Sequence, residues 1–159
     1  MPAPASPFEQ RRDALVARLQ QLAREDERIV ALWLQGSLAA GTADALSDVD
    51  AYLAVADEHF DAVYGARREL AGSLGELLIG VDSLIPGLLA LHCVIDGPVK
   101  LDLFFERASQ APEMHRPAVR MLVDKAELGS RLKSGWQPSA GRVGQRVLAV
   151  LSGTLQGGT

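Results

Sequence analysis

Two aspartates separated by one residue are the first feature of the chain that could carry chemistry. Asp48 and Asp50 open an apolar run that extends to Val55 and predicts a β-strand. On a strand, residues two apart share a face and lie about 6–7 Å apart along the backbone. Two carboxylates this close repel each other, so a buried pair needs protons or a cation. Oxygen ligands favour Mg²⁺, which keeps waters and substrate phosphates as its other ligands.

A small-residue turn lies upstream of this pair. Gly36 and Ser37 follow the apolar run Ile29–Leu34, which predicts another strand. Glycine lets the backbone come close to a phosphate. A helix beginning near Ser37 would point its free amides at the same group, and the hydroxyl of Ser37 is a further donor. We therefore expect Gly36 and Ser37 to hold the terminal phosphates of a ligand.

A third carboxylate, Asp102, lies inside the apolar segment Val99–Phe105. An unpaired charge is costly in such a strand. A third acid can deprotonate an attacking hydroxyl or complete a second metal site. Two metals about 4 Å apart would clamp the attacking and leaving oxygens of an in-line displacement at an α-phosphate.

Each of these residues also has a purely structural interpretation. Asp48 could be a cap or turn residue, and Asp50 a strand-end acid. Asp102 could form an ion pair with Lys100, two residues earlier on the same strand face, or with an arginine. Ser37 could serve only as a helix cap. Lys100 could instead neutralise a phosphate.

Together and in this order, Gly36-Ser37, Asp48-Val49-Asp50 and Asp102 resemble the signature of the polymerase-beta-type nucleotidyltransferase superfamily. The small bacterial members, the aminoglycoside-type and minimal nucleotidyltransferases, are the most similar in pattern. The resemblance covers roughly residues 29–105. It implies that the Gly-Ser turn contacts a nucleoside triphosphate, that the paired acids bind Mg²⁺, and that Asp102 joins the second of two Mg²⁺ ions or acts as the base.

The activity implied by this resemblance is magnesium-dependent nucleotidyl transfer. AMP would pass from ATP to a hydroxyl of a small molecule such as an aminoglycoside, with release of pyrophosphate. Two alternatives stay open: a minimal nucleotidyltransferase antitoxin that modifies or binds a protein toxin, and a non-catalytic nucleotide-binding module. Antibiotic-modifying members usually carry a helical C-terminal domain, whereas about fifty residues follow Asp102 here. The chain is then a minimal form, a shortened one, or one completed by a helical partner or a second copy.

The elements that must position these residues follow from periodicity and turn chemistry. Their order predicts the α/β (α+β) class, a mixed sheet with helices packed mainly on one face. We expect a nucleotidyltransferase domain over residues 1–135 and a C-terminal helix and tail, a possible remnant of a helical domain, over 136–159. The predicted helices cover residues 7–24, 58–76, 125–132 and 142–155. The predicted strands cover residues 29–34, 48–55, 88–95, 99–105 and 118–123, with a hairpin turn at 96–98.

The composition limits the partners. The chain has 159 residues and a net charge of -4, which argues against general nucleic-acid binding and against a template-directed polymerase. It contains no apolar run of the roughly 20 residues that a membrane helix needs. The single cysteine, Cys93, lies in an apolar run and is expected to be a buried, inert thiol, which fits a cytoplasmic protein.

The remaining chemically interesting side chains have ordinary explanations at this level. The three histidines show no metal-ligand spacing, and His92 is expected to be a hydrogen-bonded core residue. Trp33 is expected in the core, and Asp82 is a weak candidate for a fourth acid near the site. Surface charge is the expectation for three arginines, Arg116, Arg120 and Arg131.

Overall fold

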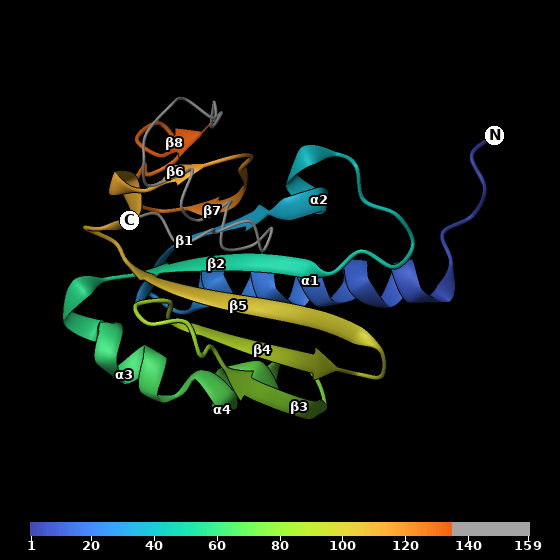
Figure 1. Ribbon diagram of the computed structural model, residues 1–159, viewed down its shortest axis with the longest axis horizontal. Coiled ribbons are helices and arrows are strands. Elements are labelled where there is room, and N and C mark those ends of the chain that lie inside the picture. The colour runs from blue at the N-terminus through green and yellow to red at the C-terminus, as the bar shows by residue number, and fades with distance from the viewer. Residues whose placement is uncertain (135–159) are drawn as a thin grey trace, which may run out of the picture.

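The computed structural model describes residues 1–134, and a six-stranded mixed sheet forms its centre (Figure 1). The strand order is β3-β4-β5-β2-β1-β7, and a separate pair, β6-β8, lies beside it. The predicted C-terminal helix and the second domain lie outside the described residues. None of the helices within residues 1–134 is long and apolar enough to cross a membrane.

The strands are β1 (Ile29–Gln35), β2 (Val49–Val55), β3 (Leu77–Asp82), β4 (Ala90–Ile95), β5 (Val99–Arg107), β6 (His115–Arg116), β7 (Arg120–Asp124) and β8 (Lys133–Ser134). The helices are α1 (Pro7–Glu25), α2 (Gly36–Ala40), α3 (Phe60–Gly65) and α4 (Arg67–Ser73), with short 3-10 turns η1 (Asp57–His59) and η2 (Ala111–Glu113).

Helix α1 begins where the sequence places it. Ser6 and Glu9 form a reciprocal capping box, in which each side chain accepts a hydrogen bond from the other residue's backbone N–H. Leu15, Leu19 and Ala23 recur at helical spacing and are buried against the sheet. Burial of this stripe, more than intrinsic propensity, holds the helix in place.

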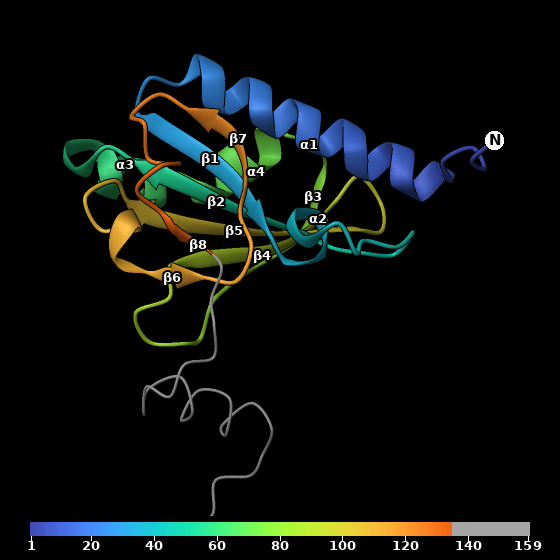
Figure 2. The ribbon, with the colours of Figure 1, turned by 90° about the horizontal axis from the view of Figure 1, so that it is seen from above.

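The helices cover one face of the sheet, which confirms the predicted fold class. Alternate residues of the central strands point into this layer, as Val49, Ala51 and Leu53 of β2 do. Residues of α1, α3 and α4 meet them there. Figure 2 shows α1 on one side of the main sheet and the small β6–β8 pair on the other.

Within residues 1–134, the opposite face is covered at one end only. Around β1 and β2, Trp33 and Ala54 pack against Ala111, Leu128 and Leu132 from the C-terminal part of the described chain. The part of this face that belongs to β5, β4 and β3 carries the half-buried side chains described below. Among the described residues, this uneven covering leaves one region of the sheet exposed.

Two predicted helices differ from the structure. The segment predicted as one helix over 58–76 is interrupted at Ala66, between α3 and α4. Residues 125–132 form turns instead of a helix. Glu127 adopts φ 54°, and the Asp124 carboxylate accepts hydrogen bonds from the backbone N–H groups of Leu128 and Gly129. Both features oppose a regular helix, because a left-handed residue cannot continue one.

The predicted surface role of Arg116 is wrong. Its side chain is 2% exposed and forms an ion pair with Glu106 on β5. The guanidinium also lies 4.6 Å from the ring centroid of Trp33, which is fully buried as predicted. Cys93 is buried too, and burial raises the pKa of its thiol to about 12, which agrees with an inert group.

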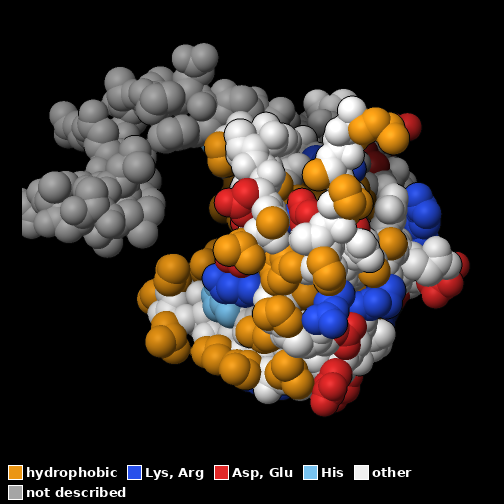
Figure 3. Space-filling model, turned by 90° about the vertical axis from the view of Figure 1, so that its right-hand side faces the viewer, with side chains coloured by type: hydrophobic (Ala, Val, Ile, Leu, Met, Phe, Trp, Pro, Cys, Tyr) orange, Lys and Arg blue, Asp and Glu red, His pale blue; other side chains and the backbone are white. Residues whose placement is uncertain are grey.

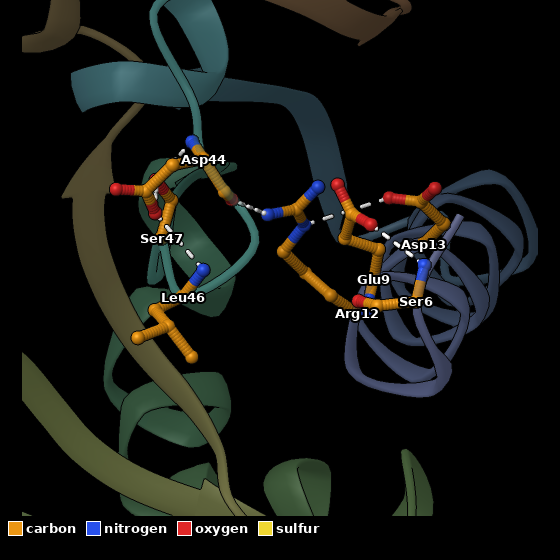
Figure 4. Close-up of polar contacts among 7 residues, drawn as sticks. All are labelled: Ser6, Glu9, Arg12, Asp13, Asp44, Leu46 and Ser47. Atoms are coloured by element: carbon orange, nitrogen blue, oxygen red, sulfur yellow. Dashed lines mark hydrogen bonds and ion pairs between the residues drawn. The ribbon is translucent and has the colours of Figure 1, made fainter. Parts of the chain in front are cut away.

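A buried arginine ties the loop ahead of β2 to α1 (Figure 4). Nη1 of Arg12 donates to the backbone carbonyl of Asp44, 2.7 Å away. The Asp44 carboxylate in turn accepts from the backbone N–H of Leu46 and from the hydroxyl of Ser47. The loop that delivers Asp48 to the start of β2 is therefore anchored to the longest helix.

We expect Arg12→Ala to lower the free energy of unfolding by about 1–3 kcal/mol, because it removes this hydrogen bond and buried aliphatic packing. Urea denaturation monitored by circular dichroism measures the change. Arg11→Ala is the matched control, since Arg11 is exposed on the same helix and its loss should cost less than about 0.5 kcal/mol. Equal effects of the two substitutions would contradict the anchoring role.

Candidate metal and nucleotide site

The pairing of β2 with β5 brings two of the predicted acids together. These strands are parallel, and Asp50 stands directly beside Asp102 in their register. Both residues point away from the helical layer, because their neighbours Ala51 and Leu103 lie in the core beneath α1. Asp48 immediately precedes β2, so all three acids come from one end of two adjacent strands.

The environment of Asp50 disfavours its charge. The pKa of its carboxyl is raised from 3.8 to about 6, first by burial and then by the negative charge of Asp102 and a hydrogen bond between the two carboxyl groups. Asp48 raises it further, whereas Lys100 lowers it. Additional positive charge, from a proton or a bound cation, would therefore stabilise the two carboxyl groups.

Gly36 lies against this pair. It has φ 67°, and a Cβ atom added to it would collide with Oδ2 of Asp50. Glycine is thus required twice here, for the left-handed backbone and for the close approach of the carboxylate. Ser37 follows in α2, a helix of five residues. The Gly-Ser turn therefore lies beside the acids, as the spacing predicted. Phosphate contact by Gly36 and Ser37 stays a prediction.

A histidine completes one side of the site. His92 on β4 faces Asp102 across the antiparallel β4–β5 ladder, and its Nδ1 lies 2.9 Å from Oδ1 of Asp102. The ring also meets the edge of Phe104, with centroids 6.2 Å apart. The predicted hydrogen bond is present, but the predicted core position is wrong, because 36% of the side chain is exposed.

The signal for His92 was available in the sequence. Counting outward from the hairpin turn at Asp96-Gly97-Pro98 pairs Ile95 with Val99, and the same register then pairs residue 92 with residue 102. The missing information was that this face of β4 leaves the His92 side chain partly exposed.

Lys100 bridges two of the acids. Its Nζ lies 3.2 Å from Oδ2 of Asp48 and 3.8 Å from Oδ2 of Asp102. The hydrogen bond to Asp48, followed by the charge of Asp102, raises the pKa of Lys100 above its ordinary value. The predicted ion pair between Lys100 and Asp102 is therefore present, with Asp48 as the closer partner.

The three carboxylates are the type of ligand that a divalent cation prefers, but they are not already arranged around one metal position. Within residues 1–134, no three Asp, Glu, His or Cys side chains are grouped as a ready metal site. Asp50 and Asp102 supply adjacent hard oxygens, and the Asp48 carboxylate is drawn toward Lys100. The ammonium group is a stand-in cation for these acids, which shows that positive charge is accommodated there.

Asp82 does not join this group. Its carboxylate forms ion pairs with Arg67 and Arg68 of α4. The first of these arginines also lies over the ring of Tyr64. Asp82 therefore fastens β3 to the helical layer, and its interpretation as a fourth acid of the site has no support in these contacts.

Comparisons with known proteins assign the chain to no family. No family model matches the sequence, and no curated protein matches it. Among solved structures, an aminoglycoside 6-adenyltransferase from Bacillus subtilis aligns with a TM-score of 0.47 and 16% sequence identity. The alignment covers 66% of this chain and 37% of that chain, so this chain spans well under half of that protein.

Gly36→Ala should lower the free energy of unfolding by about 2–3 kcal/mol, because it adds a collision with Asp50 to the strain of a left-handed alanine. Gly41→Ala is the matched control: Gly41 has φ 73° but open space around its Cβ position. Its replacement should cost about 1 kcal/mol. Urea denaturation compares the two, and equal losses would show that contact with Asp50 is unimportant.

Asp50→Asn should stabilise the protein at pH 7.5 by about 1 kcal/mol, after allowance for solvent screening of this half-buried group. A folded-state pKa raised to about 6 means that native Asp50 holds its proton more tightly than unfolded Asp50 does. Native stability then falls as pH rises from about 4 to about 6, and the full cost is present above that window.

Thermal unfolding between pH 4 and pH 8 checks this expectation. The gain of Asp50→Asn over the native chain should be small at pH 4 and reach its maximum above pH 6. Glu58→Gln, at an exposed position of η1, is the control and should show no such trend. A gain for Asp50→Asn that does not change with pH would contradict a raised pKa at this site.

Proposed function

We propose that this protein is a magnesium-dependent nucleotidyltransferase that moves AMP from ATP onto a hydroxyl group and releases pyrophosphate. The single observation that carries the proposal is the register of Asp50 with Asp102, beside Asp48 and against Gly36. Acids concentrated on an open part of a sheet, at a cost in charge repulsion, are typical of a site that binds cations and phosphates.

The reaction would be a displacement at the α-phosphorus. The acceptor oxygen forms a bond to this atom while the bond to the bridging oxygen of the β-phosphate breaks, and pyrophosphate leaves with the electron pair. Asp48, Asp50 and Asp102 would hold Mg²⁺, which when bound neutralises phosphate oxygens and aligns the attacking and leaving groups. Gly36 and Ser37 would bind the terminal phosphates through their backbone and the hydroxyl.

Asp102 would receive the acceptor's proton or complete the second metal position. Its Oδ1 is held by His92, and its Oδ2 is directed toward Lys100. The contact with His92 therefore fixes the direction of Oδ1 before a ligand arrives. Such preorganisation of one oxygen favours a defined role for Asp102 in catalysis.

A small-molecule acceptor such as an aminoglycoside is our first candidate, but one observation favours a protein acceptor. Six of the nine exposed large hydrophobic side chains within residues 1–134 lie between residues 78 and 89. Val81 is 52% exposed and stands opposite His92 in the β3–β4 register. Figure 3 shows hydrophobic side chains gathered beside a histidine and Lys or Arg side chains.

This apolar surface suits a protein partner better than a polycationic sugar. Exposed apolar patches are a common mark of protein–protein contact sites. A polycation would require carboxylates, and Glu106, on the same strand face as Asp102, is already paired with Arg116. A minimal nucleotidyltransferase acting on a protein toxin is therefore the second candidate function.

Calorimetry with a non-hydrolysable ATP analogue tests the proposed site. We expect binding in the presence of Mg²⁺, loss of binding with EDTA, and at least a tenfold weaker interaction in Asp48→Ala/Asp50→Ala, because two metal ligands are removed. Glu58→Ala is the control for removal of a surface acid and should bind like the native chain. Binding of equal strength by the native chain and the double variant would overturn the proposal.

ATP labelled at its α-phosphate separates the two acceptor classes. Label that appears on an aminoglycoside would support the first candidate. Label that appears on a co-expressed protein partner, and is lost with Val81→Asp, would support the second. Transfer to neither acceptor, in the presence of proven nucleotide binding, would leave the third interpretation, a non-catalytic nucleotide-binding module.

A further inference from the structure

The ammonium of Lys100 occupies the space between two of the three acids. It hydrogen bonds to Asp48 and lies within ion-pair distance of Asp102. The lysine and Asp48 side chains are 50% and 43% exposed, whereas Asp102 is 12% exposed. The ammonium thus reaches in from solvent and caps a more deeply placed carboxylate.

The oxygens that meet Lys100 are those a metal would need. Oδ1 of Asp102 is engaged by His92, and Oδ2 of the same carboxylate faces the lysine. The closer oxygen of Asp48 is likewise directed to the lysine. An ammonium and a divalent cation cannot occupy the same position between these two oxygens.

We propose that Lys100 is the resident counter-ion of the metal-free site and that a divalent cation binds by displacing it from Asp48 and Asp102. The inference rests on the proposed function, because it concerns the same metal position. It also explains why the three acids are not grouped as a metal cage: the Asp48 carboxylate is held by Lys100 instead of converging with Asp50.

Displacement of Lys100 is feasible on physical grounds. A half-exposed ion pair contributes little stability, so the lysine can withdraw at small cost. Its flexible four-carbon stem keeps the ammonium close to the site after it leaves the acids. A triphosphate bound there would offer it new partners. Lys100 therefore opposes binding of the metal alone and favours binding of the metal together with the nucleotide.

The test measures Mn²⁺ affinity without nucleotide, by the electron paramagnetic resonance signal of free Mn²⁺. Lys100→Gln should bind Mn²⁺ about two- to fivefold more tightly than the native chain, because the competing cation is gone. Lys125→Gln removes the same charge from an exposed position after β7 and should change the affinity much less. Unchanged or weaker binding by Lys100→Gln would overturn the inference.

A double-mutant cycle shows whether the effect passes through the observed contact. In an Asp48→Asn background, where the closer partner is absent, Lys100→Gln should give little or no gain in Mn²⁺ affinity. A gain of the same size as in the native background would overturn the contact with Asp48. Lys100→Arg retains the positive charge and should stay near the native affinity, which guards against a general effect of substitution on folding.

Addition of the non-hydrolysable ATP analogue separates this inference from the proposed function. If both are right, the analogue should strengthen Mn²⁺ binding in the native chain, and by a smaller factor in Lys100→Gln. If the analogue does not bind but Lys100→Gln still tightens Mn²⁺, the proposed function fails and the counter-ion role stands. If the analogue binds with Mn²⁺ but Lys100→Gln shows no gain without it, the counter-ion role fails alone.

Discussion

The repulsion between two adjacent carboxylates is the constraint on which the rest of the site depends. The parallel register of β2 and β5 fixes Asp50 beside Asp102, and neither side chain can turn into the core. Burial makes the repulsion stronger, because fewer waters screen the charges. A fold optimised only for stability would place neutral residues here, and the function that we propose would offset the cost of the pair.

The neighbours of this pair respond to its charge in different ways. His92 directs one oxygen of Asp102 through a hydrogen bond, and Lys100 supplies positive charge from the solvent side. Gly36 provides room, because no side chain could fit against Asp50 at that point. Three separate elements thus shape the surroundings of the pair. Strand β4 supplies the hydrogen bond of His92, β5 supplies the charge of Lys100, and the start of α2 leaves space at Gly36.

Within residues 1–134, the uneven covering of the sheet determines which part of it a ligand could reach. Helices α1, α3 and α4 close one face with a continuous apolar core. On the other face, the described part of the chain closes the end over β1 and β2 with the buried Arg116–Glu106 pair and the residues around Trp33. The acids lie at the border between this closed end and the open, apolar surface of β3 and β4. Such a border lets a ligand reach charged groups while part of it leaves water.

The sequence by itself determined five of the eight strands in residues 1–134, the first helix and the fold class, and it singled out Asp50 and Asp102, which the structure pairs. Periodicity, capping and a charge within an apolar strand are local signals. It did not determine the break at Ala66 or the left-handed Glu127 that excludes a helix after Lys125. It also did not determine the burial of Arg116, which depends on contacts with Glu106 and Trp33 on other strands. Only the tertiary structure decided which oxygens each residue contacts: His92 meets Oδ1 of Asp102, and Lys100 meets Oδ2 of both Asp102 and Asp48. The physical reason is that strand pairing brings distant residues within a few ångströms, and charge then selects which of them bind each other.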